Sequence, residues 1–276
     1  MLYVRHTPRP PLNAFVERLW LVEGGDTARR DCILPNGTVE LVVNLRDDRV
    51  QIDGTVHGGG GARTVAGAAV SGPYAEAFIV SARQHAAMMG VHFRPGGAPP
   101  VLGVPAVALA DAHVDLASLW GDTFVRELRE RLCTAPTHAQ RFRILETVLT
   151  ARLASSRLHP HPAVLVALAP ATSTQIPVRA LARDAGLSYR RFLTVFTRDV
   201  GIPPKLFFRI RRFQRVHAVA TRTGQIDWTG VALECGFCDQ AHLVNEFRRL
   251  SGLAPSQYAR AIRVGHNLLD GHVALP

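Results

Sequence analysis

The sequence predicts an α+β protein with a mostly β N-terminal region, a helical connector and an all-α C-terminal region. About the first 105 residues contain short apolar runs separated by Gly, Pro and Asp, as is typical of strands joined by turns. From about residue 115 onward, apolar residues recur at helical spacing. The last third of the chain contains an internal repeat of helical character, which indicates the class of the C-terminal region.

The chain begins with prolines and then a stretch with the pattern of an amphipathic helix. Its apolar side chains fall at helical spacing: Leu12, Phe15, Val16, Leu19 and Trp20. We therefore expect the chain to enter the β region through a helix with one apolar face.

Strands are predicted where β-rich apolar runs follow turn residues, at 39–45, 77–80 and 88–93. The glycine-rich stretch 53–72 is expected to form loops between short strands. The prolines and glycines of 94–100 are expected to break the chain. These elements together predict a small β domain.

Two connector helices are predicted over 116–132 and 142–153 from their apolar periodicity. A His-Pro-His-Pro segment at 159–162 is the best candidate linker, and Pro162 suits the first position of a further helix. The expected organisation is a β domain at 1–110, a helical connector or dimerisation region at 111–160, a second, helical domain at 161–265 and a tail at 266–276.

Composition excludes several classes of protein. Apolar residues make up 47% and charged residues 20% of the chain, which is globular rather than disordered composition. No apolar run has the length of a membrane span, and the N-terminus lacks a signal-peptide core, so we expect a cytoplasmic location without membrane attachment. Four cysteines in that compartment are expected to stay reduced.

The basic charge is concentrated in the C-terminal part. Residues 1–170 carry a net charge of +2 and residues 171–276 a net charge of +8. Such an asymmetry favours a polyanionic partner for the C-terminal part. A merely solvated basic surface remains the alternative. The use of arginine at 31 of the 32 basic positions is no sign of function, because a GC-rich genome favours arginine over lysine.

The C-terminal part repeats a motif at an offset of 50 residues. Residues 182–188 and 232–238 share the pattern A-x-x-x-G-[LF]-[SC]. Each copy is followed by an amphipathic helix, and each helix is followed by G-x-x-P, at 201–204 and 252–255. Two matched copies make a duplicated helical hairpin the natural interpretation.

The physical reading of each copy is a helix-turn-helix unit. The small residue at Ala182 or Ala232 lets two helices approach closely, and the glycine four positions later permits a left-handed turn. Ser188 and Asp239 are placed to cap the second helix of each unit.

Residues 162–262 resemble the DNA-binding domain of AraC/XylS-type transcription regulators. The resemblance is carried by 236–243 and 252–258 in the second copy and by 186–188 in the first. It implies two helix-turn-helix units joined by a long helix, expected at about 204–221. At 1.5 Å per residue that helix measures about 26 Å, close to the ~34 Å between successive major-groove faces once the width of the units is added.

The resemblance and the helical register together select the DNA-contacting residues. They are expected on the two recognition helices and on the joining helix: Ser188, Arg190, Arg191, Thr194, Arg198, Lys205, Arg212, Gln240, Ala241, Asn245 and Arg248. Val244 is expected on the same outward face of the second recognition helix. Arginines in the first turn of a recognition helix can read guanine, and Gln or Asn can pair with adenine. Arg198 and Arg212 are expected to meet phosphate or solvent instead.

The N-terminal region resembles the cupin-like sensor of one subset of these regulators. The resemblance rests on Leu19-Trp20, on 34–37 and on the Gly-Val-His-Phe-Arg-Pro-Gly-Gly string at 90–97. It implies a β sandwich or barrel that holds a small-molecule effector or mediates dimerisation. The expected partners are double-stranded DNA, RNA polymerase, an effector and a second copy of the chain, with no cofactor and no metal.

Two other functions stay open at this point. A cupin-type metal-dependent enzyme needs clustered histidines and a carboxylate, whereas His57, His85, His92 and His113 are scattered. A general RNA binder needs exposed stacking aromatics, and Tyr189 is the candidate near the recognition helices.

The Cys235-Gly236-Phe237-Cys238 string is a possible redox or zinc motif by spacing alone. It lacks a βαβ context and nearby partner ligands, so we interpret both cysteines as structural.

Overall fold

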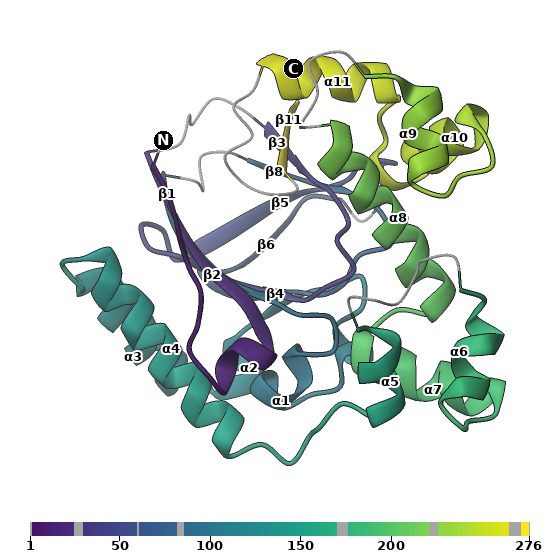
Figure 1. Cartoon of the computed structure of the whole chain (residues 1–276). Helices are drawn as coiled ribbons and strands as arrows, with labels where there is room; N and C mark the ends of the chain where they lie inside the picture. The colour runs from purple at the N-terminus through teal and green to yellow at the C-terminus, as the bar shows by residue number, and fades with distance from the viewer. Residues whose placement is uncertain are drawn as a thin grey trace.

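The N-terminal strands form a two-layer β sandwich in the computed structural model (Figure 1). The structure describes residues 2–24, 30–59, 61–81, 86–169, 176–220, 226–264 and 272–275. Within these ranges the first sheet has the spatial order β1 (Leu2–His6), β2 (Val16–Glu23), β9 (Ala87–Phe93), β4 (Glu40–Asn44), β7 (Ala68–Ser71) and β10 (His113–Asp115). The second sheet has the order β11 (His272–Leu275), β3 (Arg30–Ile33), β8 (Phe78–Ser81), β5 (Arg49–Thr55) and β6 (Arg63–Ala66).

The first sheet is buried on both faces. Along β2, Leu19 and Leu21 pack into the apolar core beneath the connector helices, while Trp20 and Val22 face the other way with Met88. This division follows from the alternation of side chains along a strand. The sheet therefore separates a helix-covered core from the space between the two sheets.

The helix predicted over the first part of the chain is wrong. Only Leu12–Ala14 form a short 3-10 turn, η1, and Val16–Glu23 form strand β2. A strand that is buried on both faces has apolar residues at nearly every position, so its pattern also fits a helical spacing over a short window.

The other predicted strands are confirmed as β4, β8 and β9. The glycine-rich stretch contains more strand than expected, because β6 and β7 both lie within it. The predicted break at 94–100 ends early: Pro99 and Pro100 belong to helix α1 (Ala98–Leu102). Proline is tolerated in the first turn of a helix, where its missing N–H has no partner to lose.

The connector helices cover the outer face of the first sheet (Figure 1). They comprise η3 (Ala106–Leu109), α2 (Ala117–Trp120), α3 (Asp122–Thr134) and α4 (His138–Ala154), with α1 beside them. The single helix predicted over 116–132 is two helices, because Gly121 adopts φ +87° and ends α2 before α3 begins. The second predicted connector helix is confirmed as α4.

The C-terminal region is helical, as predicted. Its helices are α5 (Pro162–Ala167), α6 (Val178–Asp184), α7 (Tyr189–Val200), α8 (Pro204–Ala220), α9 (Trp228–Glu234), α10 (Gln240–Ser251) and α11 (Pro255–Val264). Figure 1 shows α8 running between the α6–α7 pair at one end and the α9–α10 pair at the other. Helix α5 begins at Pro162 as expected, and the expected end of α8 at Thr221 lies outside the described residues.

The C-terminal strand returns to the sandwich. A tail is expected over 266–276, whereas 272–275 form β11 and pair antiparallel with β3. Val273 is fully buried in an apolar cluster that also contains Cys32 and Leu34 of the sandwich and Phe247 of the helical region. One continuous core therefore joins the β sandwich to the C-terminal helices.

Candidate nucleic-acid interface

The first helix-turn-helix unit consists of α6 and α7. Gly186 adopts φ +66° in the turn, a conformation that glycine reaches without steric cost. The Ser188 Oγ accepts a hydrogen bond of 3.2 Å from the backbone N–H of Arg191, which confirms the predicted cap. Phe192 and Phe196 are fully buried beneath α7. The opposite face of α7 is thereby fixed toward solvent.

The second unit, α9 and α10, repeats this construction. Gly236 adopts φ +79°, and the Asp239 Oδ1 accepts a hydrogen bond of 2.7 Å from the backbone N–H of His242. The cap predicted at Asp239 is confirmed. Leu243 and Phe247 are buried on the inner face of α10. The sequence repeat is thus a repeat of local structure.

Helix α8 joins the two units through buried contacts. Phe207 packs edge-on against Phe196 of the first unit, with ring centroids 5.5 Å apart, and Phe213 packs against Phe247 of the second at 4.9 Å. The Arg209 guanidinium also donates two hydrogen bonds of 2.7 and 2.8 Å to the Glu246 carboxylate on α10. A bidentate pair of this kind fixes orientation as well as distance.

Both recognition helices end against the β sandwich. A Cβ added at Gly201, after α7, would lie 2.4 Å from the Cγ of Pro73, and one at Gly252, after α10, would lie 2.7 Å from the Cβ of Val56. The backbone N–H of Ala77 donates a 2.9 Å hydrogen bond to the Leu250 carbonyl. Because the C-terminal ends are covered, the N-terminal turns of α7 and α10 are the ends left open to a partner.

The structure places most of the predicted site residues in solvent. The exposed ones are Ser188, Arg190, Arg191, Thr194, Arg198, Lys205, Gln240, Ala241, Asn245 and Arg248. Arg212 and Val244 are half-buried. The exposed residues of α7 and α10 lie on the faces opposite the buried aromatic residues, as the helical register predicts.

Two of the predicted basic residues are already engaged within the protein. The Arg198 Nε donates a 2.6 Å hydrogen bond to the Asp199 carboxylate, which raises the pKa of Arg198. Asp199 is itself buried and accepts a 2.7 Å hydrogen bond from the backbone N–H of His161. The Arg212 guanidinium lies 5.6 Å from the centre of the Phe237 ring. Both side chains therefore already have a contact within the helical region.

Comparisons with known proteins agree with this geometry. Residues 4–115 match a family described as "Domain of unknown function (DUF6597)", and residues 181–261 match one described as "Helix-turn-helix domain". Residues 181–261 form an AraC-type helix-turn-helix domain. The match begins within α6 and covers α7, the joining helix, α9 and α10, so this AraC-type domain includes all the predicted site residues.

One relative is an uncharacterized HTH-type transcriptional regulator from Haemophilus influenzae. It is 26% identical over 125 residues, which cover 45% of this chain and 41% of that protein, so the match spans less than half of the relative's length.

Among solved structures, ToxT from Vibrio cholerae O395 bound to (E)-4-(8-methylnaphthalen-1-yl)but-3-enoic acid aligns over 88% of this chain and 98% of its own, with 8% identity and a TM-score of 0.44. Unsaturated fatty acid bound wild-type ToxT from strain SCE256 aligns over 87% and 93%, with 9% identity and the same TM-score of 0.44.

One basic residue that borders the interface, just before the matched domain, was not predicted from the sequence. Arg179, exposed on α6, lies with its guanidinium 4.9 Å from the centre of the Tyr189 ring. Tyr189, considered above as a stacking surface for RNA bases, therefore carries an arginine on one side. The sequence does contain a signal for it, because Arg179 is a basic residue on α6, the helix that precedes recognition helix α7.

The two cysteines of the C-x-x-C string occupy different environments. Cys235 is buried, and burial raises the pKa of its thiol, whereas Cys238 is exposed before α10. All four cysteines of the chain are free thiols. Cys235 occupies the place that Ala185 takes in the first unit, where a small side chain allows close helix packing.

The part of the chain that the structure describes contains no group of three or more His, Cys, Asp or Glu side chains able to hold a metal ion. His85, one of the histidines considered for a metal site, lies outside the described residues. Across the same described ranges, no helix combines the length and the apolar character needed to cross a membrane.

Proposed function

We propose that this chain is a transcription regulator that binds a specific double-stranded DNA sequence through both helix-turn-helix units. The observation that carries the proposal is the placement of the two recognition helices. Their C-terminal ends are packed against the sandwich, and their capped N-terminal turns are exposed. The N-terminal turn of a recognition helix is the part that reaches base edges in the major groove.

The chemistry of the exposed residues supports a division of roles. Arg190 and Arg191 lie in the first turn of α7, where a guanidinium can bind guanine through two hydrogen bonds. Gln240 and Asn245 on α10 carry amides that can pair with adenine. Ser188, Thr194, Ala241 and Arg248 lie around them on the same helices, and Lys205 begins the joining helix, where a phosphate contact is the natural role.

We further propose that the sandwich controls the AraC-type domain in response to a small-molecule effector, because the two share one buried core. RNA polymerase and a second copy of the chain complete the set of proposed partners, and the cytoplasm is the proposed location. This function requires no cofactor.

The experiment that tests the function is selection of duplexes bound by the full chain from a random pool. The expected result is one enriched sequence, bound more tightly than random DNA, with affinity that falls steeply as salt rises because counterions are released. The full chain is needed because Cys32, Leu34 and Val273 complete the core of the helical region. Enrichment of no sequence over random DNA contradicts the proposal.

A further inference from the structure

A cavity lies between the two sheets of the sandwich. Its wall is mainly apolar and includes Trp20, Val50, Phe78 and Met88. Glu40, Ser71 and His113 add polar groups to the wall, and the Ser71 Oγ lies 2.9 Å from the His113 Nδ1. Burial lowers the pKa of His113 to about 4, so its imidazole is neutral at pH 7. The cavity therefore suits a compact, mainly apolar molecule with one hydrogen-bond donor for the Glu40 carboxylate.

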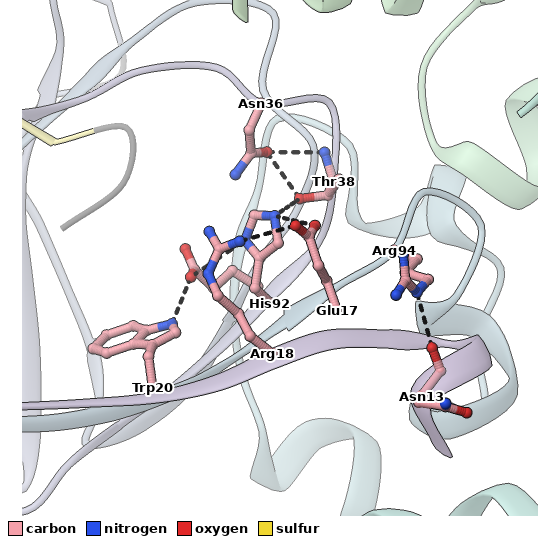
Figure 2. Close-up of polar contacts among 9 residues, drawn as sticks. Asn13, Glu17, Arg18, Trp20, Asn36, Thr38, His92 and Arg94 are labelled. Atoms are coloured by element: carbon pink, nitrogen blue, oxygen red, sulfur yellow. Dashed lines mark hydrogen bonds and ion pairs between the residues drawn. The ribbon is translucent and has the colours of Figure 1, made fainter. Parts of the chain in front are cut away.

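Two of the cavity residues also begin a chain of polar contacts, shown in Figure 2. The Trp20 indole N–H donates a 2.8 Å hydrogen bond to the Glu40 Oε1, and the same oxygen lies 3.7 Å from the His92 Nδ1. Arg18, His92 and Glu40 occupy directly paired positions on β2, β9 and β4. Gly90 leaves room for the Trp20 ring, because a Cβ there would lie 2.4 Å from it.

The chain continues from His92 to the loop before β4. The His92 Nε2 lies 3.4 Å from the Thr38 Oγ1 and 3.6 Å from a carboxylate oxygen of Glu17. The Thr38 hydroxyl and backbone N–H both donate to the Asn36 Oδ1, at 3.0 and 2.9 Å. His92 and Thr38 are buried, so an alternative partner from solvent is not available to either side chain.

The loop that Asn36 and Thr38 hold lies against the middle of α8. Gly37 adopts φ +73°, and a Cβ there would lie 3.1 Å from the Phe207 ring and 3.6 Å from Ile210. The Gln214 side chain donates a 2.5 Å hydrogen bond to the Pro35 carbonyl. Helix α8 carries both helix-turn-helix units, so a displacement of this loop reaches both recognition helices through one element.

We propose that Trp20, Glu40, His92, Thr38 and Asn36 form a coupling path that transmits occupancy of the sandwich cavity to α8. A ligand that fills the cavity presses on the Trp20 ring and the Glu40 side chain, and so changes the position of the carboxylate beside His92. Because buried polar groups keep their partners, His92, Thr38 and the loop follow. The consequence for DNA rests on the proposed function, whereas the coupling itself does not.

The test uses full-length variants and hydrogen exchange of the α8 amides. Ala69 lines the cavity, and Ala69→Leu places extra side-chain volume there in lieu of a ligand. Ala68→Leu is the matched control, because Ala68 precedes it on β7 but packs into the core on the opposite face. We expect Ala69→Leu to raise exchange over residues 207–214 by about fivefold, and Ala68→Leu to change it by less than about twofold.

The second half of the test breaks the path. Thr38→Val removes the hydroxyl between His92 and Asn36 at nearly constant volume, and Thr64→Val, on the exposed face of β6, is its control. In the Thr38→Val background, Ala69→Leu is expected to add less than about twofold to α8 exchange, since coupled sites are not additive. Equal effects of Ala69→Leu with and without Thr38, or no effect on α8 in either, overturn the proposal.

If Ala69→Leu does not fold, the test uses Glu40→Gln, Thr38→Val and the double variant that combines them. The α8 amides of the double variant should exchange no faster than those of the faster single variant. If the increases in α8 exchange from the two substitutions add up in the double variant, the coupling is overturned. DNA binding is measured separately on the selected duplex. A chain that binds the duplex but shows no coupling in exchange contradicts this inference alone. A chain that shows coupling but selects no duplex contradicts the proposed function alone.

Discussion

The two helix-turn-helix units share a backbone frame but differ in the chemistry that they expose. Both recognition helices end in glycine with positive φ, +96° at Gly201 and +72° at Gly252, and both begin with a side-chain cap. The first turn of α7 exposes Arg190 and Arg191, whereas Gln240 begins α10. The comparison indicates that the duplicated residues are those that the hairpin needs to fold, and that the exposed residues diverged.

The units also differ in how they are attached to the rest of the molecule. The first is tied to the chain before α5 through Asp199, which accepts from the His161 backbone and from Arg198. The second is tied to α8 through Arg209 and Glu246. The two units have the same backbone structure but different contacts with the rest of the molecule. Matched substitutions in the two units should therefore give different results.

The largest effect is expected from the central aromatic residues. Phe196→Ala and Phe247→Ala should each lower the free energy of unfolding by about 3–5 kcal/mol, because each removes a fully enclosed ring and leaves a cavity. Chemical denaturation followed by circular dichroism measures the loss. A single shared transition in both variants is expected from the common core, and two separate transitions would show that the units fold independently.

Substitutions at two glycines distinguish the cost of backbone strain from the cost of a clash with the sandwich. Gly186→Ala meets open space and should cost about 1–2 kcal/mol from the left-handed backbone alone. Gly201→Ala should cost more than this, because the new Cβ also meets Pro73 and the carbonyl of Ala106. Thermal unfolding of both variants measures the difference. Equal losses at the two positions would contradict the packing of α7 against the sandwich.

The difference in exposed chemistry predicts different losses of DNA affinity. Arg190→Ala or Arg191→Ala should weaken binding of the selected duplex by about 1–3 kcal/mol and relax one base position. Gln240→Ala or Asn245→Ala should relax a different position and leave the salt dependence unchanged, because no charge is lost. Fluorescence anisotropy against single-base variants of the duplex distinguishes them. Equal losses on selected and random DNA would place the side chains on the phosphate backbone.

The smallest effect is expected from the caps. Ser188→Ala and Asp239→Ala should each cost about 1 kcal/mol of stability, because each leaves a helix N–H without its side-chain acceptor. The loss at Asp239 should exceed that at Ser188 at neutral pH, since a carboxylate also interacts with the positive end of the helix dipole. Unfolding at pH 7 measures both, and a larger loss at Ser188 would reverse the order.

Local patterns were sufficient to predict much of the fold. The repeat, the caps and the start of α5 at Pro162 all depend on residues within a few positions of one another. The prediction failed where distant contacts decide. The run from Val16 to Glu23 is a strand because β1 and β9 pair with it on either side, and neither pairing is visible in a nine-residue window.

The candidate interface divides in the same way. Helical register predicts that Arg190 and Asn245 are exposed, and they are. Helical register does not predict which group an arginine side chain contacts. The contacts of Arg198 with Asp199, Arg212 with Phe237 and Arg179 with Tyr189 are therefore seen only in the structure.

The two helix-turn-helix units could be predicted from local patterns, because left-handed glycines, caps and apolar spacing act over a single turn or helix. Long-range contacts, in contrast, attach the helical region to the sandwich. Strand β11 pairs with β3, and the loop at Gly37 lies on α8. Strands β3 and β11 are more than two hundred residues apart in the sequence. Strand pairing and the burial of apolar surface act between such distant segments, and a local sequence pattern does not identify the distant segment with which it will pack.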